Sequence, residues 1–161
     1  MSLDEIAIRP FTSADIKLSN VLPIRYPQSF FLQLLLLPAR ICLVAYPRSD
    51  PQNLIGFISA AYSPEPPTDA KIPRIEILTL GVAPSYRHRG LARRLIRSIP
   101  QHLCASHSIF FQANVATSNT SALKFYEQLG FRIASDVITN LYRTTSSSKD
   151  GYLIVGCINS D

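Results

Sequence analysis

Arginine and glycine residues that follow an apolar run carry the clearest chemical signal in this sequence, a site for a phosphate-bearing ligand. Residues 75–82 are rich in branched side chains, as an interior strand is, and Pro84 ends the run before a helical pattern begins. At Gly90 the backbone can approach a ligand closely, and the first turn of the following helix has amide hydrogens without internal partners. Those amides favour a pyrophosphate group. Positive charge is added by Arg87, Arg89, Arg93 and Arg94.

A second segment, residues 119–132, reads NTSALKFYEQLGFR, and its Asn119 suits the N-cap of a helix. Together with RHRGLA at residues 87–92, this segment resembles the GNAT superfamily of N-acetyltransferases. In that family RxxGxA binds the pyrophosphate of acetyl-CoA, and the N-x-x-A-x-x-F-Y-x-x-x-G-F segment flanks the other side of the cofactor. The resemblance covers nearly the whole chain, and it implies acetyl-CoA as the cosubstrate and no metal.

The resemblance also implies a role for each residue around acetyl-CoA. The backbone around Gly81 is expected to pair with the pantetheine arm as another strand would, and Asn119 to contact that arm. Tyr126 is expected near the thioester sulfur, where it can protonate the departing thiolate; the alternative is an aromatic that only packs its helix. The predicted cofactor-binding residues are Leu80, Gly81, Val82, Arg87, His88, Arg89, Gly90, Leu91, Ala92, Arg93, Asn119, Ser121, Ala122, Phe125 and Tyr126.

Three further segments resemble protein N-terminal acetyltransferases, and among them the NatE catalytic subunits, also called San. They are LPIRY at residues 22–26, TLGVAPSYRHRG at residues 79–90 and NLYR at residues 140–143. In that subtype the first segment lines the pocket for the first residue of the substrate, and the third contacts its backbone. A peptide end needs a small apolar pocket and a few fixed hydrogen-bond partners. The predicted substrate-binding residues are Pro23, Ile24, Tyr26, Leu78, Leu141 and Tyr142.

The reaction that the resemblance implies is direct attack of a neutral amine on the acetyl thioester, with a base or a water chain to accept the proton. In the NatE subtype a Tyr on the fourth strand and a His on the fifth hold the catalytic water, but here the matching residues are Glu76 and Asn114. Glu76 can act as the base through water, and the amide of Asn114 can orient that water. Glu76 could instead be an exposed carboxylate paired with Arg74 or Lys71. Strand alternation places it on the face of Leu78 and Leu80 unless a bulge intervenes.

Two other functions stay open. One is acetylation of lysine side chains or of small amines such as polyamines or aminoglycosides, although few clustered carboxylates are present to bind a polyamine. The other is a weakly active subunit that binds acetyl-CoA inside a NatA-type complex on the ribosome. The net charge of +5 suggests an anionic partner, which could be the 3′-phosphate of CoA, an acidic protein or ribosomal RNA, or the arginines could form a solvated face.

Length and composition favour a single acetyltransferase domain over residues 1–161. Three cysteines without a CxxC or Cys/His spacing argue for reduced thiols in a cytoplasmic or nuclear protein and against zinc. The apolar residues 30–46 are interrupted by Gln33, Pro38 and Arg40, so they do not predict a membrane span. The first ten residues lack the apolar core of a signal peptide.

The expected fold is α/β, with a mixed sheet of about seven strands splayed between the fourth and fifth, and about four helices. Pro100 should kink or end the basic helix. The strands are predicted near residues 5–9, 41–46, 54–62, 75–82, 109–115, 133–139 and 152–157. The helices are predicted from Thr12 or Ser13 to about Leu22, from Pro27 onward, after Arg87, and over residues 120–128 with Gly130 at the end.

Overall fold

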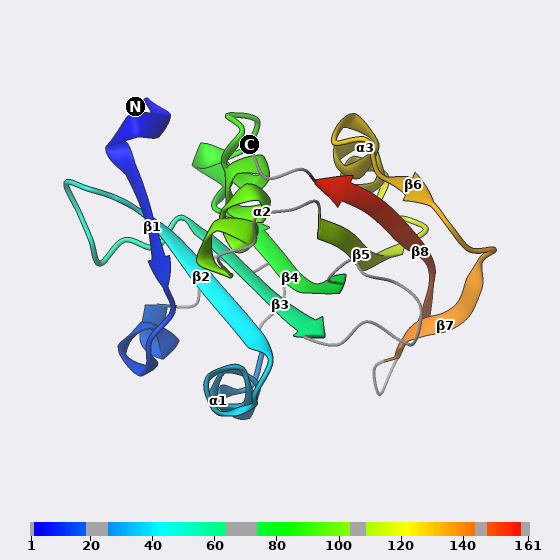
Figure 1. Ribbon diagram of the computed structural model, residues 1–161, viewed down its shortest axis with the longest axis horizontal. Helices are drawn as coiled ribbons and strands as arrows, with labels where there is room; N and C mark the ends of the chain where they lie inside the picture. Colours follow the sequence, from blue (N-terminus) through cyan, green and yellow to red (C-terminus); the bar gives the residue numbers. More distant parts are fainter. Residues whose placement is uncertain (1, 19–25, 64–73, 104–108, 144–147, 159–161) are drawn as a thin grey trace.

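A mixed β-sheet runs through the whole of the computed structural model, which describes residues 2–18, 26–63, 74–103, 109–143 and 148–158 (Figure 1). The strands are β1 (Ile6–Pro10), β2 (Arg40–Pro47), β3 (Gly56–Ser63), β4 (Arg74–Val82), β5 (Ile109–Ala116), β6 (Arg132–Ile133), β7 (Ile138–Arg143) and β8 (Ser148–Ile158). The helices are α1 (Gln28–Leu36), α2 (Leu91–His102) and α3 (Thr120–Gln128), with short 3-10 helices η1 (Leu3–Glu5), η2 (Ser13–Leu18) and η3 (Pro84–Tyr86).

The strands follow the order β1-β2-β3-β4-β5-β8-β6, and β7 pairs with β8. Every pair is antiparallel except β4 and β5, which are parallel. Figure 1 shows α1 on one side of the sheet and α2 on the other. The two hydrophobic cores show the same arrangement. Helix α1 packs with Cys42 and Val44 on one face of the sheet, whereas α2 and α3 pack with Leu43 and Ala45 on the opposite face. We call these the α1 face and the α2/α3 face.

The central parallel strands separate partway along their length. Four residue pairs join them, from Arg74 opposite Phe110 to Ile77 opposite Ala113, and within the described residues β4 has no β5 partner beyond Ile77. Backbone groups of a strand need partners, so the edge of β4 beyond Ile77 can accept a strand-like ligand. The predicted splay between the fourth and fifth strands is thereby confirmed, as is the mixed α/β sheet.

Several boundaries differ from the predictions because side chains and turns override local propensity. The helix expected from Thr12 or Ser13 is a 3-10 helix over Ser13–Leu18, and its expected continuation to Leu22 lies outside the described residues. The strand predicted over residues 133–139 is two strands, β6 and β7, because Ser135 Oγ accepts the Leu153 amide (2.9 Å) where a ladder bond would be. The helix α2 runs past Pro100 and ends two residues later at His102. The described part of the chain has three α-helices and eight strands, whereas the sequence predicts about four helices and about seven strands.

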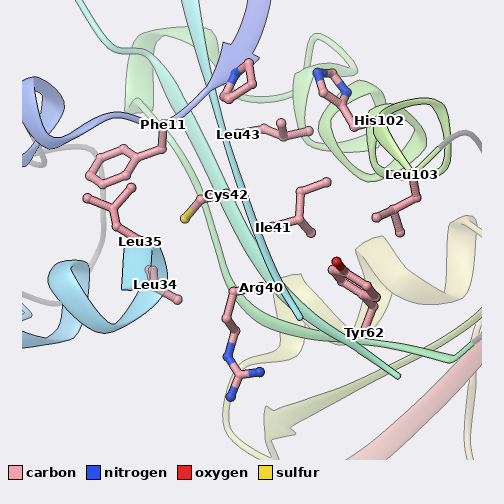
Figure 2. A pocket seen from close by; sticks show the side chains of 11 residues that line it. Phe11, Leu34, Leu35, Arg40, Ile41, Cys42, Leu43, Tyr62, His102 and Leu103 are labelled. Carbon is pink, nitrogen blue, oxygen red and sulfur yellow. The ribbon is translucent and has the colours of Figure 1, made fainter. Parts of the chain in front are cut away.

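A cavity of about 360 Å³ opens beside β2, between α1 and the end of α2 (Figure 2). Its wall is mostly apolar, with the Tyr62 hydroxyl, the Arg40 guanidinium and the His102 ring as polar exceptions. None of the predicted catalytic or cofactor-binding residues lines this cavity. The functional site therefore has to be sought where β4 and β5 separate.

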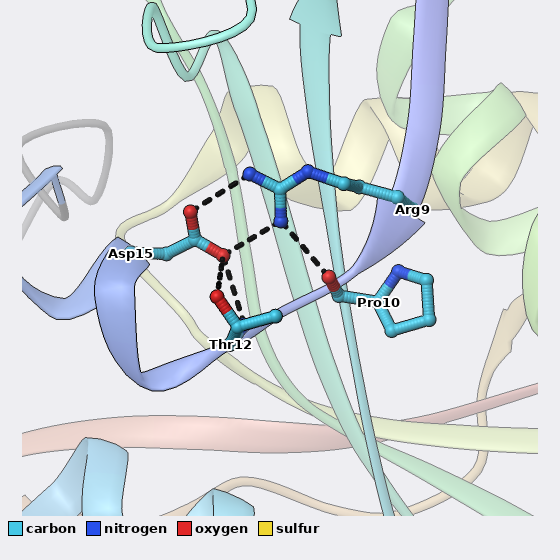
Figure 3. A network of polar contacts seen from close by, with 4 residues as sticks. All are labelled: Arg9, Pro10, Thr12 and Asp15. Carbon is cyan, nitrogen blue, oxygen red and sulfur yellow. Dashed lines mark hydrogen bonds and ion pairs between the residues drawn. The ribbon is translucent and has the colours of Figure 1, made fainter.

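Asp15 anchors η2 to the first strand through a network of short hydrogen bonds (Figure 3). Its carboxylate accepts hydrogen bonds from both terminal guanidinium nitrogens of Arg9 (2.7 and 2.8 Å) and from the Thr12 amide (2.8 Å). The hydrogen bonds from Arg9 hold the pKa of this buried carboxyl below its usual range. A carboxyl with a lowered pKa stabilises the fold above its ordinary pKa, and this contribution is lost as the pH falls through the lowered value.

The Asp15→Asn variant should therefore lose about 3 kcal/mol of unfolding free energy at pH 7, because Arg9 would lose its charged partner. Urea unfolding measured at several pH values checks this. The difference from the wild type should shrink below about pH 4, because there the carboxyl of the unfolded chain takes up a proton before the folded one, whose pKa is lowered. Asp50→Asn, in the exposed turn after β2, is the control and should change nothing. Equal stability of the Asp15 variant and the wild type at pH 7 would contradict the prediction.

Candidate functional site

The turn from β4 into α2 has the geometry of an anion site. Gly90 is the N-cap of α2 with φ +82°, a left-handed conformation that glycine adopts without steric cost, and no side chain caps the first turn. The amides of that turn remain available to a ligand. Arg87 Nε donates to the Val82 carbonyl (2.9 Å), which ties the turn to β4. Arg89, stacked over the Tyr86 ring, and Arg93 are exposed beside it.

Asn119 starts α3 as predicted. Its Oδ1 accepts the Ala122 amide (3.2 Å) and the Ser121 hydroxyl (3.4 Å), so one side chain orders the first turn. Phe125 lies edge-on to Tyr126, with ring centroids 5.1 Å apart. The predicted cofactor residues therefore come from three elements: the end of β4, the start of α2 and the helix α3. Leu91 and Val82 are buried, so only their backbones can reach a ligand.

A bulge in β4 decides which way Glu76 faces. Thr79 pairs with Ser59 and Ile77 pairs with Ala60, so Leu78 has no partner of its own on β3. The hydroxyls of Ser59 and Thr79, both buried, lie 2.6 Å apart across this bulge. Directly paired residues share a face. The expectation that Glu76 shares the face of Leu80 is therefore wrong, because the extra residue reverses the alternation.

Register places Leu80 opposite Ile58 on the α2/α3 face, and Glu76 opposite Ala61 on the α1 face. On its other side Glu76 pairs with Gln112 of β5. Asn114 follows Gln112 by two residues on the same face, because Phe111, Ala113 and Val115 fill the α2/α3 core. Three polar side chains thus share one side of the sheet next to the splay. Glu76 forms no ion pair with Arg74, whose guanidinium lies over the Phe110 ring.

Gln112 was missed as a functional candidate although the sequence carried the signal. In IFFQANVA the apolar residues 111, 113 and 115 alternate with Gln112 and Asn114, which predicts one buried and one polar face. Gln112 is half-buried, whereas Asn114 is exposed. A side chain beside Glu76 that both donates and accepts hydrogen bonds can orient a water molecule there.

Three tyrosines from separate elements influence one another electrostatically. Burial raises the pKa of Tyr126, and the nearby Tyr142 raises it further. Burial likewise raises the pKa of Tyr142, with an added effect of Tyr26. Tyr26 stacks on Phe30 at the start of α1, with centroids 4.3 Å apart.

Tyr126 is held in place by aromatic packing and by β8. Its ring stacks on Phe131 at 5.4 Å and 27°, and the Phe131 amide donates to the Tyr126 carbonyl (2.9 Å). Phe131 in turn lies flat on Gly156 of β8, where an added Cβ would come within 2.1 Å of the ring. Tyr126 is thus a buried, neutral phenol in a fixed orientation.

Residues 2–131 match the family model of the Acetyltransferase (GNAT) family. The chain belongs to this family. Among curated proteins it is 28% identical to the histone acetyltransferase MCC1 of Arabidopsis thaliana over 87% of the chain and 63% of that protein. It is 26% identical to N-alpha-acetyltransferase 60 of Danio rerio, over 98% of the chain and 72% of that protein. The chain thus spans about two thirds of the length of these two relatives.

The GNAT fold is also seen in a solved structure. The crystal structure of Arabidopsis thaliana NAA60 in complex with a bisubstrate analogue superposes with a TM-score of 0.75 at 25% identity, over 96% of the chain and 99% of that protein. The splayed β4 and β5 of the GNAT chain are thus part of an architecture shared with a related acetyltransferase.

Some predicted site residues of the GNAT chain are brought together and others cannot be placed. Glu76, Asn114, Leu141 and Tyr142 all lie on or beside the α1 face, and Leu78 is exposed at the bulge. Pro23 and Ile24 lie outside the described residues. Within the described ranges no group of His, Cys, Asp or Glu side chains could hold a metal ion. No described helix is long and apolar enough to span a membrane.

Proposed function

We propose that this chain is an acetyl-CoA-dependent N-alpha-acetyltransferase, which transfers acetyl to the N-terminal amine of a protein or peptide by direct attack on the thioester. The observation that carries the proposal is the set of polar side chains Glu76, Gln112 and Asn114 on the α1 face, beside the point where β4 and β5 separate. The relatives named for N-alpha-acetylation support it.

The donor side fits acetyl-CoA. The uncapped start of α2 behind Gly90 suits a pyrophosphate, and the exposed Arg89 and Arg93 suit the remaining phosphate. The edge of β4 beyond Ile77 has backbone groups to pair with an extended amide-bearing arm. His88, two residues before Gly90, also has a positive φ of +60°, so the loop presents its backbone and not only its side chains.

On the acceptor side, the proposed base is Glu76, which takes the proton of the amine through a water molecule. Gln112 and Asn114 orient that water from the neighbouring strand. Tyr26 and Tyr142 contact the backbone of the peptide end. Tyr126 gives its proton to the departing thiolate, for which its raised pKa keeps it protonated at neutral pH.

The finer parts of the proposal are the NatE subtype, a NatA-type auxiliary subunit and ribosome as partners, and a cytoplasmic or nuclear location. They rest on the TLGVAPSYRHRG and NLYR segments and on the basic surface of α2. Acetylation of lysine side chains is the second candidate, because a relative of comparable identity is named for histone acetylation.

Steady-state measurement of the thiol released from acetyl-CoA, with matched acceptor substrates, tests both candidate functions. The full chain is given acetyl-CoA with a peptide that has a free α-amine, with the same peptide blocked at its N-terminus and carrying one internal lysine, or with spermidine. We expect kcat/KM for the free α-amine to exceed the other two at least about tenfold, with mass spectrometry placing the acetyl group on the terminus. Faster turnover of the blocked peptide would support lysine acetylation. Calorimetric binding of acetyl-CoA without turnover would support the subunit role.

A further inference from the structure

We infer that Asp150 and Gly151, at the start of β8, form the element that sets acceptor specificity, because together they fix where Leu141 and Tyr142 of β7 stand. This inference rests on the proposed function. Neither residue carries chemistry of its own, so both act as positioning residues. Leu141 and Tyr142 are the residues of β7 that lie on the proposed acceptor side of the site.

Gly151 leaves a space that Leu141 and Tyr142 fill. A Cβ added there would lie 2.4 Å from Leu141 Cδ2 and 3.3 Å from Tyr142 Cε2. It would also lie 3.0 Å from the Val115 carbonyl oxygen, which belongs to the backbone of β5 and cannot yield as a side chain can. A side chain at position 151 therefore displaces the end of Leu141, and Tyr142 and the Val115 carbonyl have to shift slightly as well. Glycine is required here by close approach, which places β7 side chains directly on β8.

Asp150 fixes the backbone that carries those side chains. Ile138 pairs with Gly151 and Tyr142 pairs with Lys149, so three residues of β7 lie opposite the single residue Asp150. This bulge depends on Asn140, whose φ of +54° is left-handed. Asp150 Oδ1 accepts the Asn140 amide (2.9 Å) and so stabilises that conformation.

Asp150 also connects the β7 bulge to β5. The Asp150 carbonyl accepts the Thr117 amide (2.9 Å), just after the end of β5, and Gly151 pairs with Ala116. The polar residues of β5 and the bulge of β7 are therefore held to one another through Asp150 and Gly151. Tyr142 lies on β7 and the proposed phosphate site lies at the start of α2, so the displacement of Tyr142 is expected to change the acceptor side and not the phosphate site.

Peptide kinetics of Gly151→Ala test the inference. Against a panel of peptides that differ in their first two residues, KM should rise about tenfold for the preferred peptide and the order of preference should change. The calorimetric Kd for acetyl-CoA should stay within about twofold, since the phosphate site is on α2. Asp150→Asn, which keeps an acceptor oxygen for the Asn140 amide, should resemble the wild type, whereas Asp150→Ala should resemble Gly151→Ala.

A double variant separates a positioning effect from a general loss of stability. Leu141→Ala removes the methyl group nearest the new Cβ, so adding it to Gly151→Ala should restore the KM of Leu141→Ala alone. Cys157→Ala, exposed on the same strand at its far end, is the control and should leave the order of preference unchanged. An unchanged order of preference in both Gly151→Ala and Asp150→Ala would overturn the inference.

A spectroscopic measurement keeps the inference independent of the proposed function. Tyrosinate absorbance recorded as the pH is raised should show one tyrosine of Gly151→Ala ionising nearer its ordinary pKa than in the wild type, because Tyr142 is less buried. An unchanged titration would overturn the placement of Tyr142. A wild type that fails on every free α-amine, with a changed titration in the variant, would overturn the proposed function and leave the placement supported.

Discussion

Replacing Glu76 with glutamine should lower kcat about 100-fold or more at pH 7, with the Kd for acetyl-CoA unchanged. Glutamine keeps the shape and hydrogen bonding of the side chain but cannot accept the proton of the amine, and general-base catalysis contributes roughly 10²–10⁴ in rate. The bulge at Leu78 makes this a defined expectation, because it places Glu76 on the α1 face, where it pairs with Gln112. Steady-state kinetics from pH 6 to 9 and calorimetry with acetyl-CoA provide the measurements.

The matched control for Glu76→Gln is Asp50→Asn, an isosteric change of an exposed carboxylate in the turn between β2 and β3. It should retain wild-type kcat and KM. Gln112→Ala should lower kcat less than Glu76→Gln, because it removes the orientation of a water molecule and not the base itself. Full turnover by Glu76→Gln over the whole pH range would remove Glu76 from the mechanism and assign it to strand pairing alone.

Replacing Tyr126 with phenylalanine should lower kcat about 10- to 100-fold at pH 7, with little change in KM. The hydroxyl is the proposed acid for the departing thiolate, and burial together with Tyr142 raises its pKa, so it stays protonated well above neutral pH. The deficit should be about the same from pH 6 to 9, because a phenol with a raised pKa stays protonated throughout that range in the wild type. The raised pKa also means that the wild type should show no loss of this acid below about pH 10.

Tyr62→Phe is the control for Tyr126→Phe, because Tyr62 is a half-buried tyrosine packed against the same core and lines the cavity beside β2. It should leave kcat unchanged. Thermal unfolding of both variants should stay close to that of the wild type, since the rings and their aromatic contacts remain. A lowered kcat accompanied by a clear loss of thermal stability would indicate a packing role, and an unchanged kcat would remove Tyr126 as the acid.

The donor side could be predicted from the sequence because its signals are local. Gly90 lies directly before α2, where the sequence predicts a close backbone approach to a ligand, and Asn119 caps α3 through its own side chain. Each feature depends on a few neighbouring residues. The splay of the sheet could be predicted as well, but only through the resemblance to a known family, since no single segment encodes it.

The acceptor side could be predicted only in part because it depends on pairing between distant segments. The direction of Glu76 is set by the bulge at Leu78, which arises where Ser59 and Thr79 bond across two strands. The position of Tyr142 depends on the space next to Gly151, and no local sequence pattern predicts that these two residues approach each other. Gln112 is different, because its alternation with the apolar residues 111, 113 and 115 is a local signal in the sequence.

Because β4 and β5 separate, the residues proposed to bind the acceptor amine and those proposed to bind acetyl-CoA can change independently in evolution. In the proposed mechanism the amine is bound on the α1 face by Tyr26 and by residues of β4, β5 and β7, whereas the phosphates are bound at the start of α2. Substitutions around Leu141 and Tyr142 can therefore redirect the enzyme to new N-termini while the acetyl donor is retained. A library randomised at the β7 bulge would sample acceptor preference over an unchanged donor site.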